Sequence, residues 1–208
     1  MIPAHEALQR LREGNRRFTA QIGNAEADLR QRRRAALPQD QLPFAIVLGC
    51  SDARVPAEIV FDQGLGDLFV IRIAGNIVAP SQVGSVEFAA SRFNTRLVVV
   101  LGHSQCGAIE ATLEELQRPA ENQSPNLRSI VDRVRPSVEV LLKTELRHDL
   151  DKLLAHAVRA NVALSVDHLR HGSEVLEELI RNEGLRIVGA EYSLTTGVVE
   201  FFDDSGIG

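Results

Sequence analysis

The sequence lacks the features that mark several specialised classes of protein. Among its 208 residues there is no tryptophan, and there are only two cysteines. No run of about 18 successive apolar residues occurs, so we expect no transmembrane helix, and two cysteines are too few for the disulfide framework of a small secreted domain. The formal net charge of -5 gives no electrostatic reason to expect nucleic acid or an anionic membrane as the main partner. A small molecule or another protein chain is therefore the expected partner.

The length suits one domain that buries its core without disulfides. We expect a single domain over residues 1–208, in which a helical arm at 1–37 precedes an α/β core at 38–208. Charged residues stand near the start of the chain, where a signal peptide would have its apolar segment, which predicts a cytoplasmic protein. In that reducing compartment we expect Cys50 and Cys106 to be thiols or metal ligands, although the sequence alone leaves oxidation to a disulfide open.

Apolar patterning predicts an α/β fold with a mostly parallel central sheet flanked by helices. Short β-branched apolar runs at 43–49, 67–75 and 96–102 are typical of strands, and the first and third are nearly continuous, as strands buried on both faces are. A helix beginning at Pro80 separates the last two runs, and strands separated by helices imply a parallel sheet. Further helices are expected at 107–117, 126–142, 149–170 and 173–184.

The two ends of the chain depart from this pattern. Residues 4–18 carry apolar side chains at near-helical spacing, and an arginine-rich segment follows as far as Pro38, which together predict an N-terminal helical arm. The basic run at 30–34 has two interpretations, a solvated helix face and an anion-binding patch, and the solvated face is favoured. At the other end, runs at 186–194 and 197–204 are typical of a hairpin, so we expect an antiparallel C-terminal edge strand.

Two predicted strand ends carry candidate metal ligands. Cys50 follows the first buried strand, and His103 and Cys106 follow the third. Ligands of open α/β sheets gather outside the carboxyl ends of the strands, so these three side chains can meet there. Two thiolates and one imidazole suit zinc, and they leave a fourth position open, as in catalytic sites. The alternative is two small buried cysteines and a hydrogen-bonded core histidine; the joint placement favours zinc.

Asp52 and Arg54 lie two positions apart at the mouth of this predicted site. As an exposed ion pair they would contribute only about 0–1 kcal/mol. Beside a metal, however, the guanidinium can hold the carboxylate ionised and oriented. A hydrolase mechanism based on Ser104 is disfavoured, because the G-x-S-x-G spacing is missed by one position.

Three motifs then identify a family resemblance. They are "CSDARVPAE", "DLFVIRIAGN" and "GHSQCGA". In this order and at these separations they resemble the β-class carbonic anhydrases, over at least residues 41–110. The resemblance implies one Zn²⁺ per chain, and it implies roles for ten residues. Cys50, His103 and Cys106 would bind zinc, Asp52 and Arg54 would form the catalytic dyad, and Gln41, Phe69, Ala74, Phe88 and Gly107 would line the substrate pocket. Phe88 departs from members that have tyrosine there.

The implied activity is the reversible hydration of carbon dioxide to bicarbonate and a proton by zinc-bound hydroxide, in a homodimer or a dimer-based tetramer with exchanged arms. In such a dimer Gln41 and Phe88 would serve the neighbouring chain's pocket. Two alternatives stay open: hydrolysis of carbon disulfide or carbonyl sulfide on the same scaffold, and a non-catalytic zinc-stabilised interaction protein. Some members are also closed by bicarbonate at a site that uses a tryptophan three residues before the first zinc cysteine. Here Val47 stands in that position, so weak or absent regulation by bicarbonate is expected, although Gly49 and Arg72 match other parts of that site.

Overall fold

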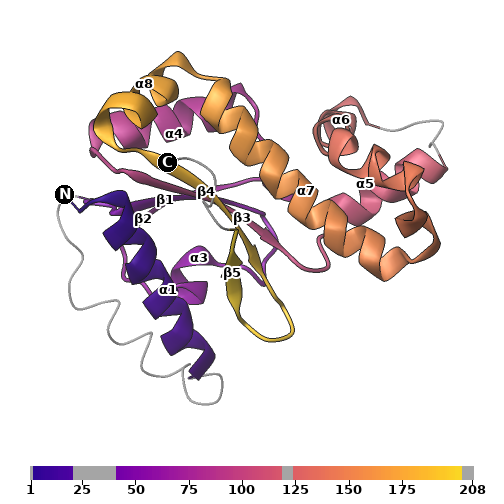
Figure 1. Ribbon diagram of the computed structural model, residues 1–208, viewed down its shortest axis with the longest axis horizontal. Helices are drawn as coiled ribbons and strands as arrows, with labels where there is room; N and C mark the ends of the chain where they lie inside the picture. Colours follow the sequence, from indigo (N-terminus) through magenta and orange to yellow (C-terminus); the bar gives the residue numbers. More distant parts are fainter. Residues whose placement is uncertain (1, 21–40, 119–123, 203–208) are drawn as a thin grey trace.

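The computed structural model describes residues 2–20, 41–118 and 124–202, with a sheet of five strands at its centre (Figure 1). The strands are β1 (Ala45–Gly49), β2 (Leu68–Arg72), β3 (Leu97–His103), β4 (Arg186–Tyr192) and β5 (Val199–Phe201). They lie in the order β2-β1-β3-β4-β5, in which the first four run parallel and β5 runs antiparallel to β4. The predicted fold class is therefore confirmed, including the antiparallel C-terminal edge strand.

Helices cover both faces of the sheet (Figure 1). On one face lie α1 (Ala4–Ala20) and α3 (Ala57–Val60), and on the other lie α4 (Pro80–Arg92), α7 (Leu150–His171) and α8 (Glu174–Glu183). Toward the carboxyl ends of the parallel strands lie α5 (Gly107–Gln117) and α6 (Pro125–Glu139), with short 3-10 helices at Ala74–Asn76, Leu141–Lys143 and Glu145–His148. None of the helices in the described ranges combines the length and apolar character that crossing a membrane requires.

The central strands are buried on both faces because successive side chains point to opposite layers. In β1, Val47 belongs to the apolar layer that contains α1, whereas Ile46 and Leu48 belong to the layer that contains α4, α7 and α8. In β3 the same alternation separates Val99 from Val98. None of these five side chains is exposed. This two-sided burial fixes the register, since a slip by one residue would exchange the two layers.

The observed elements differ from the predicted ones mainly near the C-terminus. The helix predicted to reach residue 142 ends at Glu139 and continues as a short 3-10 turn. The hairpin strands are shorter than predicted, because Leu194 and Phe202 continue the apolar pattern outside the ladder and pack against the core there. Residues 203 and 204 of the predicted strand lie outside the described residues. The short helix α3 was not predicted.

The helix α1 packs on the sheet of its own chain. Ala7 and Leu11 are buried in the same apolar layer as Val47. The sequence offered no partner for the predicted arm within the sheet, but this layer accommodates its first part. Residues 21–37 of the arm, including the basic run, lie outside the described residues.

A buried asparagine side chain fixes the other end of α1. Asn15 is 5% exposed, and its amide nitrogen donates to the carbonyls of Val60 (3.0 Å) and Gly197 (2.9 Å). Its amide oxygen accepts from the N–H of Val199 at 2.8 Å. One side chain therefore joins α1 to the end of α3 and to the β4–β5 hairpin.

Replacing Asn15 by alanine is expected to destabilise the fold by about 1–3 kcal/mol, because three buried backbone groups lose their partner. Unfolding in urea, followed by circular dichroism, measures the change. The matched control is Gln9→Ala on the same helix: Gln9 makes an exposed hydrogen bond to Glu13, so the free energy of unfolding should change by less than about 0.5 kcal/mol. Equal stability of the two variants would contradict this role for Asn15.

Candidate metal centre

The three predicted metal ligands meet at the carboxyl ends of β1 and β3. Cys50 follows β1 directly, His103 is the last residue of β3, and Cys106 is the N-cap residue of α5. Their ligand atoms all lie within 4.8 Å of one another. All three residues are buried, with exposed fractions of 6%, 0% and 2%. The geometry that strand-end placement predicted is therefore present.

The loop after β3 returns Cys106 to this cluster. Gln105 has a φ of +55°, in the left-handed region, and the chain turns there before α5 begins. The preceding residue joins the loop to the β4–β5 hairpin: the N–H of Ser104 donates to the carbonyl of Tyr192, and its hydroxyl accepts from the N–H of Leu194, both at 3.0 Å. The position of the loop therefore depends on the hairpin beside it.

The orientation of His103 leaves one ring nitrogen for a metal. Its Nδ1 lies 2.9 Å from the carbonyl oxygen of Ser104, which places the ring proton on Nδ1 and leaves Nε2 as an acceptor. In the part of the chain that the structure describes, Nε2 is buried and has no hydrogen-bond partner. An unpaired buried polar atom costs about 1–3 kcal/mol. Two sulfurs and this orphaned nitrogen form a donor set that fits zinc.

The two cysteines share negative charge unequally. A hydrogen bond from the Cys106 thiol lowers the pKa of Cys50, although burial acts in the opposite direction. The pKa of Cys106 is raised because its proton is held in that hydrogen bond, and because burial disfavours a second charge. Ionisation of both sulfurs together therefore requires a cation beside them.

Asp52 and Arg54 form a bidentate pair next to the cluster. The guanidinium donates from Nε to Oδ1 at 2.9 Å and from Nη2 to Oδ2 at 2.7 Å, and the backbone N–H of Arg54 also donates to Oδ1 at 2.9 Å. These hydrogen bonds hold the pKa of Asp52 well below its usual range. The Oδ2 atom lies 3.9 Å from Nε2 of His103. The carboxylate is therefore ionised, oriented and close to the position that a metal would take.

Two further groups support the loop at residues 50–52, and the sequence analysis did not assign them to it. Arg72, at the end of β2, donates from Nε to the carbonyl of Cys50 at 3.0 Å and from Nη2 to the carbonyl of Asp52. The N–H of Gly75 donates to the sulfur of Cys50 at 3.3 Å. The available signal was register, since β2 pairs with β1 and Gly49 lies opposite Arg72.

The predicted pocket residues fall into two groups, of which one lies beside the cluster. Ala74 directly precedes Gly75, whose N–H reaches the sulfur of Cys50. Gly107 directly follows Cys106 and begins α5.

The other three pocket residues lie toward the amino ends of the strands. Gln41 precedes β1, so the whole strand separates it from Cys50. The ring of Phe69 lies 6.2 Å from that of Phe88, measured between centroids. Phe69 is in register with Ile46, four residues before Cys50, which corresponds to about 13 Å along a strand. The fold therefore does not bring Gln41, Phe69 and Phe88 to the metal cluster of the same chain.

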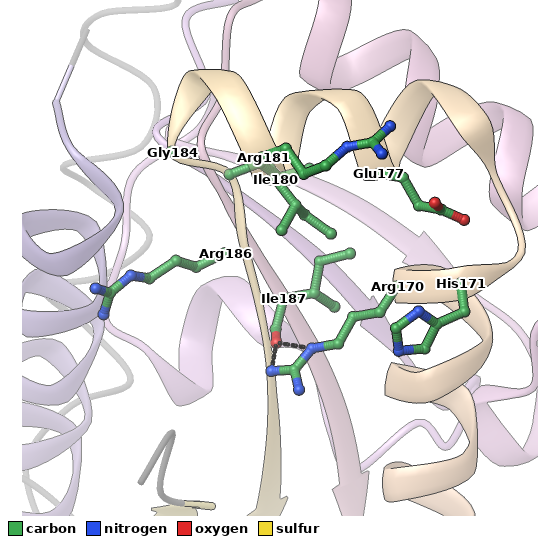
Figure 2. A pocket seen from close by; sticks show the side chains of 9 residues that line it. Arg170, His171, Glu177, Ile180, Arg181, Gly184, Arg186 and Ile187 are labelled. Atoms are coloured by element: carbon green, nitrogen blue, oxygen red, sulfur yellow. Dashed lines mark hydrogen bonds between the residues drawn. The ribbon is translucent and has the colours of Figure 1, made fainter. Parts of the chain in front are cut away.

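A large cavity lies at the opposite end of the sheet from the metal cluster. It has a volume of about 560 Å³ and lies between the end of α7, α8 and the start of β4 (Figure 2). Ile180 and Ile187 line it, the guanidinium of Arg170 is turned to the carbonyl oxygen of Ile187, and Arg186 points away from the other side chains. The basic groups do not converge on one point, so we assign no chemistry to this cavity.

Comparisons with known proteins agree with this fold and site. The sequence model of the carbonic anhydrase family matches residues 45–199. A carbonic anhydrase of Mycolicibacterium smegmatis is 41% identical over 195 residues, which cover 93% of this chain and 91% of that protein. Carbonic anhydrase 2 of Mycobacterium tuberculosis is 38% identical over 205 residues, which cover 96% and 93%. The crystal structure of the β-carbonic anhydrase CafA of Aspergillus fumigatus matches with a TM-score of 0.72 and 25% identity, over 96% of this chain and 90% of that one.

A mostly parallel α/β sheet with two cysteines and one histidine at its carboxyl edge defines a metalloenzyme class with a three-ligand site. With the matches above, the chain belongs to the carbonic anhydrase family, and within it to the β class.

Proposed function

We propose that this chain catalyses the reversible hydration of carbon dioxide to bicarbonate and a proton, with one zinc ion per chain held by Cys50, His103 and Cys106. The observation that carries the proposal is the buried three-ligand cluster with an ionised carboxylate 3.9 Å from the histidine nitrogen. Three protein ligands leave the fourth tetrahedral position for a reactant. Zinc would supply a Lewis acid that lowers the pKa of water from 15.7 to about 7.

Asp52 orients the nucleophile in this proposal. An ionised carboxylate only accepts hydrogen bonds, so Asp52 would accept a hydrogen bond from the attacking oxygen and leave a lone pair of that oxygen directed at the carbon of carbon dioxide. Arg54 binds both carboxylate oxygens and so restrains Asp52 from taking the fourth coordination position itself. Ionisation of Asp52 throughout the neutral range follows from its lowered pKa.

A second copy of the chain completes the substrate pocket. Gln41 can donate from its amide to a substrate oxygen, but it lies at the far end of β1 from the metal ligands of its own chain. Its neighbour Leu42 is 76% exposed, and Phe88 is 54% exposed beside the edge strand β2. An interface at this end of the strands would bury both apolar side chains. We therefore infer a homodimer, or a tetramer built from dimers, in which Gln41, Phe69 and Phe88 face the partner's cluster and Ala74 and Gly107 face their own.

Two narrower points stay predictions from the sequence. They are a cytoplasmic location and weak or absent regulation by bicarbonate. Carbon disulfide and carbonyl sulfide also carry an electrophilic central carbon between two double bonds, so their hydrolysis is the alternative activity. Assays of the purified protein with each substrate distinguish these activities from one another and from a non-catalytic zinc protein.

Stopped-flow measurement of carbon dioxide hydration tests the proposed function directly. The protein is expected to contain about one zinc per chain and to lose activity on treatment with a chelator. Replacing Cys106 by serine removes one thiolate, so zinc content and activity should both fall at least tenfold. Full zinc content with intact activity in that variant would refute the ligand assignment.

Replacing Arg54 by alanine should lower the rate of hydration on the order of 10²-fold while zinc content is retained, because Asp52 is then free to ligate the metal. Hydroxide competes for zinc better than water does, so the deficit should shrink as the pH rises from about 6 to 9. Arg17→Ala is the matched control. Arg17 also forms an ion pair with an aspartate, since its Nε lies 2.6 Å from Oδ2 of Asp62, but this pair is not part of the cluster. An Arg54 variant with the rate and pH profile of the control would reject the restraint.

Mixed dimers test the contribution of Gln41. Gln41→Ala should retain zinc and lose rate, whereas Cys50→Ser should lose zinc. When both chains are produced together with different affinity tags, the isolated mixed dimer should be more active than either variant alone, because one of its sites has its own metal ligands and the partner's Gln41. No recovery in a mixed dimer of confirmed composition would show that Gln41 does not act across the interface.

A further inference from the structure

A tight turn after β2 delivers a backbone N–H to the metal ligand Cys50. The N–H of Gly75 donates to the sulfur of Cys50 at 3.3 Å. Gly75 and Asn76 both have left-handed backbones, with φ values of +69° and +42°. Glycine adopts the left-handed region without steric cost and asparagine tolerates it, and groups outside the turn bind its carbonyls.

Those groups come from α7. The amide nitrogen of Asn161 donates to the carbonyl of Gly75 at 2.7 Å, and the hydroxyl of Ser165 donates to the carbonyl of Asn76 at 3.0 Å. The two residues are four positions apart, so they lie on one face of the helix. Both are buried, with exposed fractions of 1% and 4%. Adjacent carbonyls of the turn are thus held by two rigidly spaced side chains.

Packing adds a second restraint on the turn. A Cβ atom on Gly75 would lie 3.1 Å from the Cβ of Ala108 and 3.3 Å from a methyl of Val134. Ala108 belongs to α5 and Val134 to α6, so these two helices pack over the turn. A side chain at position 75 would therefore disturb these neighbours, so the turn is closely packed on this side.

These polar side chains carry a stability cost. Asn161 lies on the apolar side of α7, next to the fully buried Val162 and close to Val158. Within the described residues, the amide oxygen of Asn161 and the amide nitrogen of Asn76 are buried without a hydrogen-bond partner. Each such atom costs about 1–3 kcal/mol. Asn161 thus places a polar group in an apolar layer, and the atom of its amide that finds a partner is the nitrogen, on the carbonyl of Gly75.

We propose that Asn161 is a positioning residue of the metal centre, with Ser165 as its second support. By holding the carbonyl of Gly75, Asn161 keeps the N–H of the same residue on the sulfur of Cys50. A hydrogen bond to a thiolate ligand draws electron density away from the sulfur and so limits the charge that it donates to the metal. This inference rests on the proposed zinc site, and it assigns to α7 the control of the donor strength of Cys50.

Cobalt substitution tests the proposal through the charge-transfer absorption from thiolate to metal. In Asn161→Leu the sulfur loses its directed N–H, so this band should move to longer wavelength than in the unaltered protein. Ser165→Ala should move it in the same direction by a smaller amount. Val166→Ala on the same helix is the control: Val166 packs in the layer with α8, so the variant loses stability without a change in the band.

The outcomes separate this proposal from the metal site on which it rests. If the unaltered protein binds no cobalt, the metal centre itself is refuted. If Asn161→Leu is folded, holds one cobalt per chain and absorbs like the control, the positioning role is refuted. Should Asn161→Leu fail to fold, Ser165→Ala decides: a shift relative to Val166→Ala supports the proposal, and an unshifted band overturns it.

Discussion

The metal centre depends on the parallel pairing of β1 with β3. In their register Gly49 lies opposite Leu101, so Cys50 and His103 leave the sheet at the same edge, one and two residues later. Because side chains alternate along a strand, a shift of one residue would send His103 to the other face of the sheet. Apolar layers on both faces forbid that shift. The geometry of a polar site is thus fixed by the burial of valine, leucine and isoleucine.

Charge balance is the second constraint. Two thiols and one carboxylate converge at this edge, and both cysteines are part of an apolar cluster with Ile77 and Ile109. The guanidinium of Arg54 binds the carboxylate, and that of Arg72 binds the backbone of the same loop. In such surroundings the two thiols do not ionise together, since the pKa of Cys50 is lowered by the neighbouring thiol and the pKa of Cys106 is raised by the same contact and by burial. A divalent cation would change the balance, since it stabilises both thiolates while Arg54 continues to neutralise the carboxylate. The donor set of two cysteines and one histidine therefore fits a divalent metal ion.

The sequence predicted the parts of the site that are local to a motif. Cys50, His103 and Cys106 could be placed because each stands next to the end of an apolar run, and ends of neighbouring parallel strands share an edge. Asp52 and Arg54 could be paired because they are two residues apart. Asn161 and Ser165 both interrupt the apolar stripe of α7, but the sequence analysis did not assign them a role. Periodicity indicates which face of a helix a residue occupies, and it does not indicate which turn of the chain that residue contacts. The separation of Gln41 from Cys50, in contrast, could be predicted, because the apolar run at 43–49 lies between them.

The short edge strand has a consequence for association with other chains. In the described part of the protein, β5 pairs with Ala190–Tyr192 and ends at Phe201. The N–H of Arg186 points to β3, where it donates to Arg96, so the carbonyl of Ile187 points outward. Arg170 donates to that carbonyl from two nitrogens. An incoming strand would find this acceptor taken, so this part of β4 is a poor template for the addition of another strand.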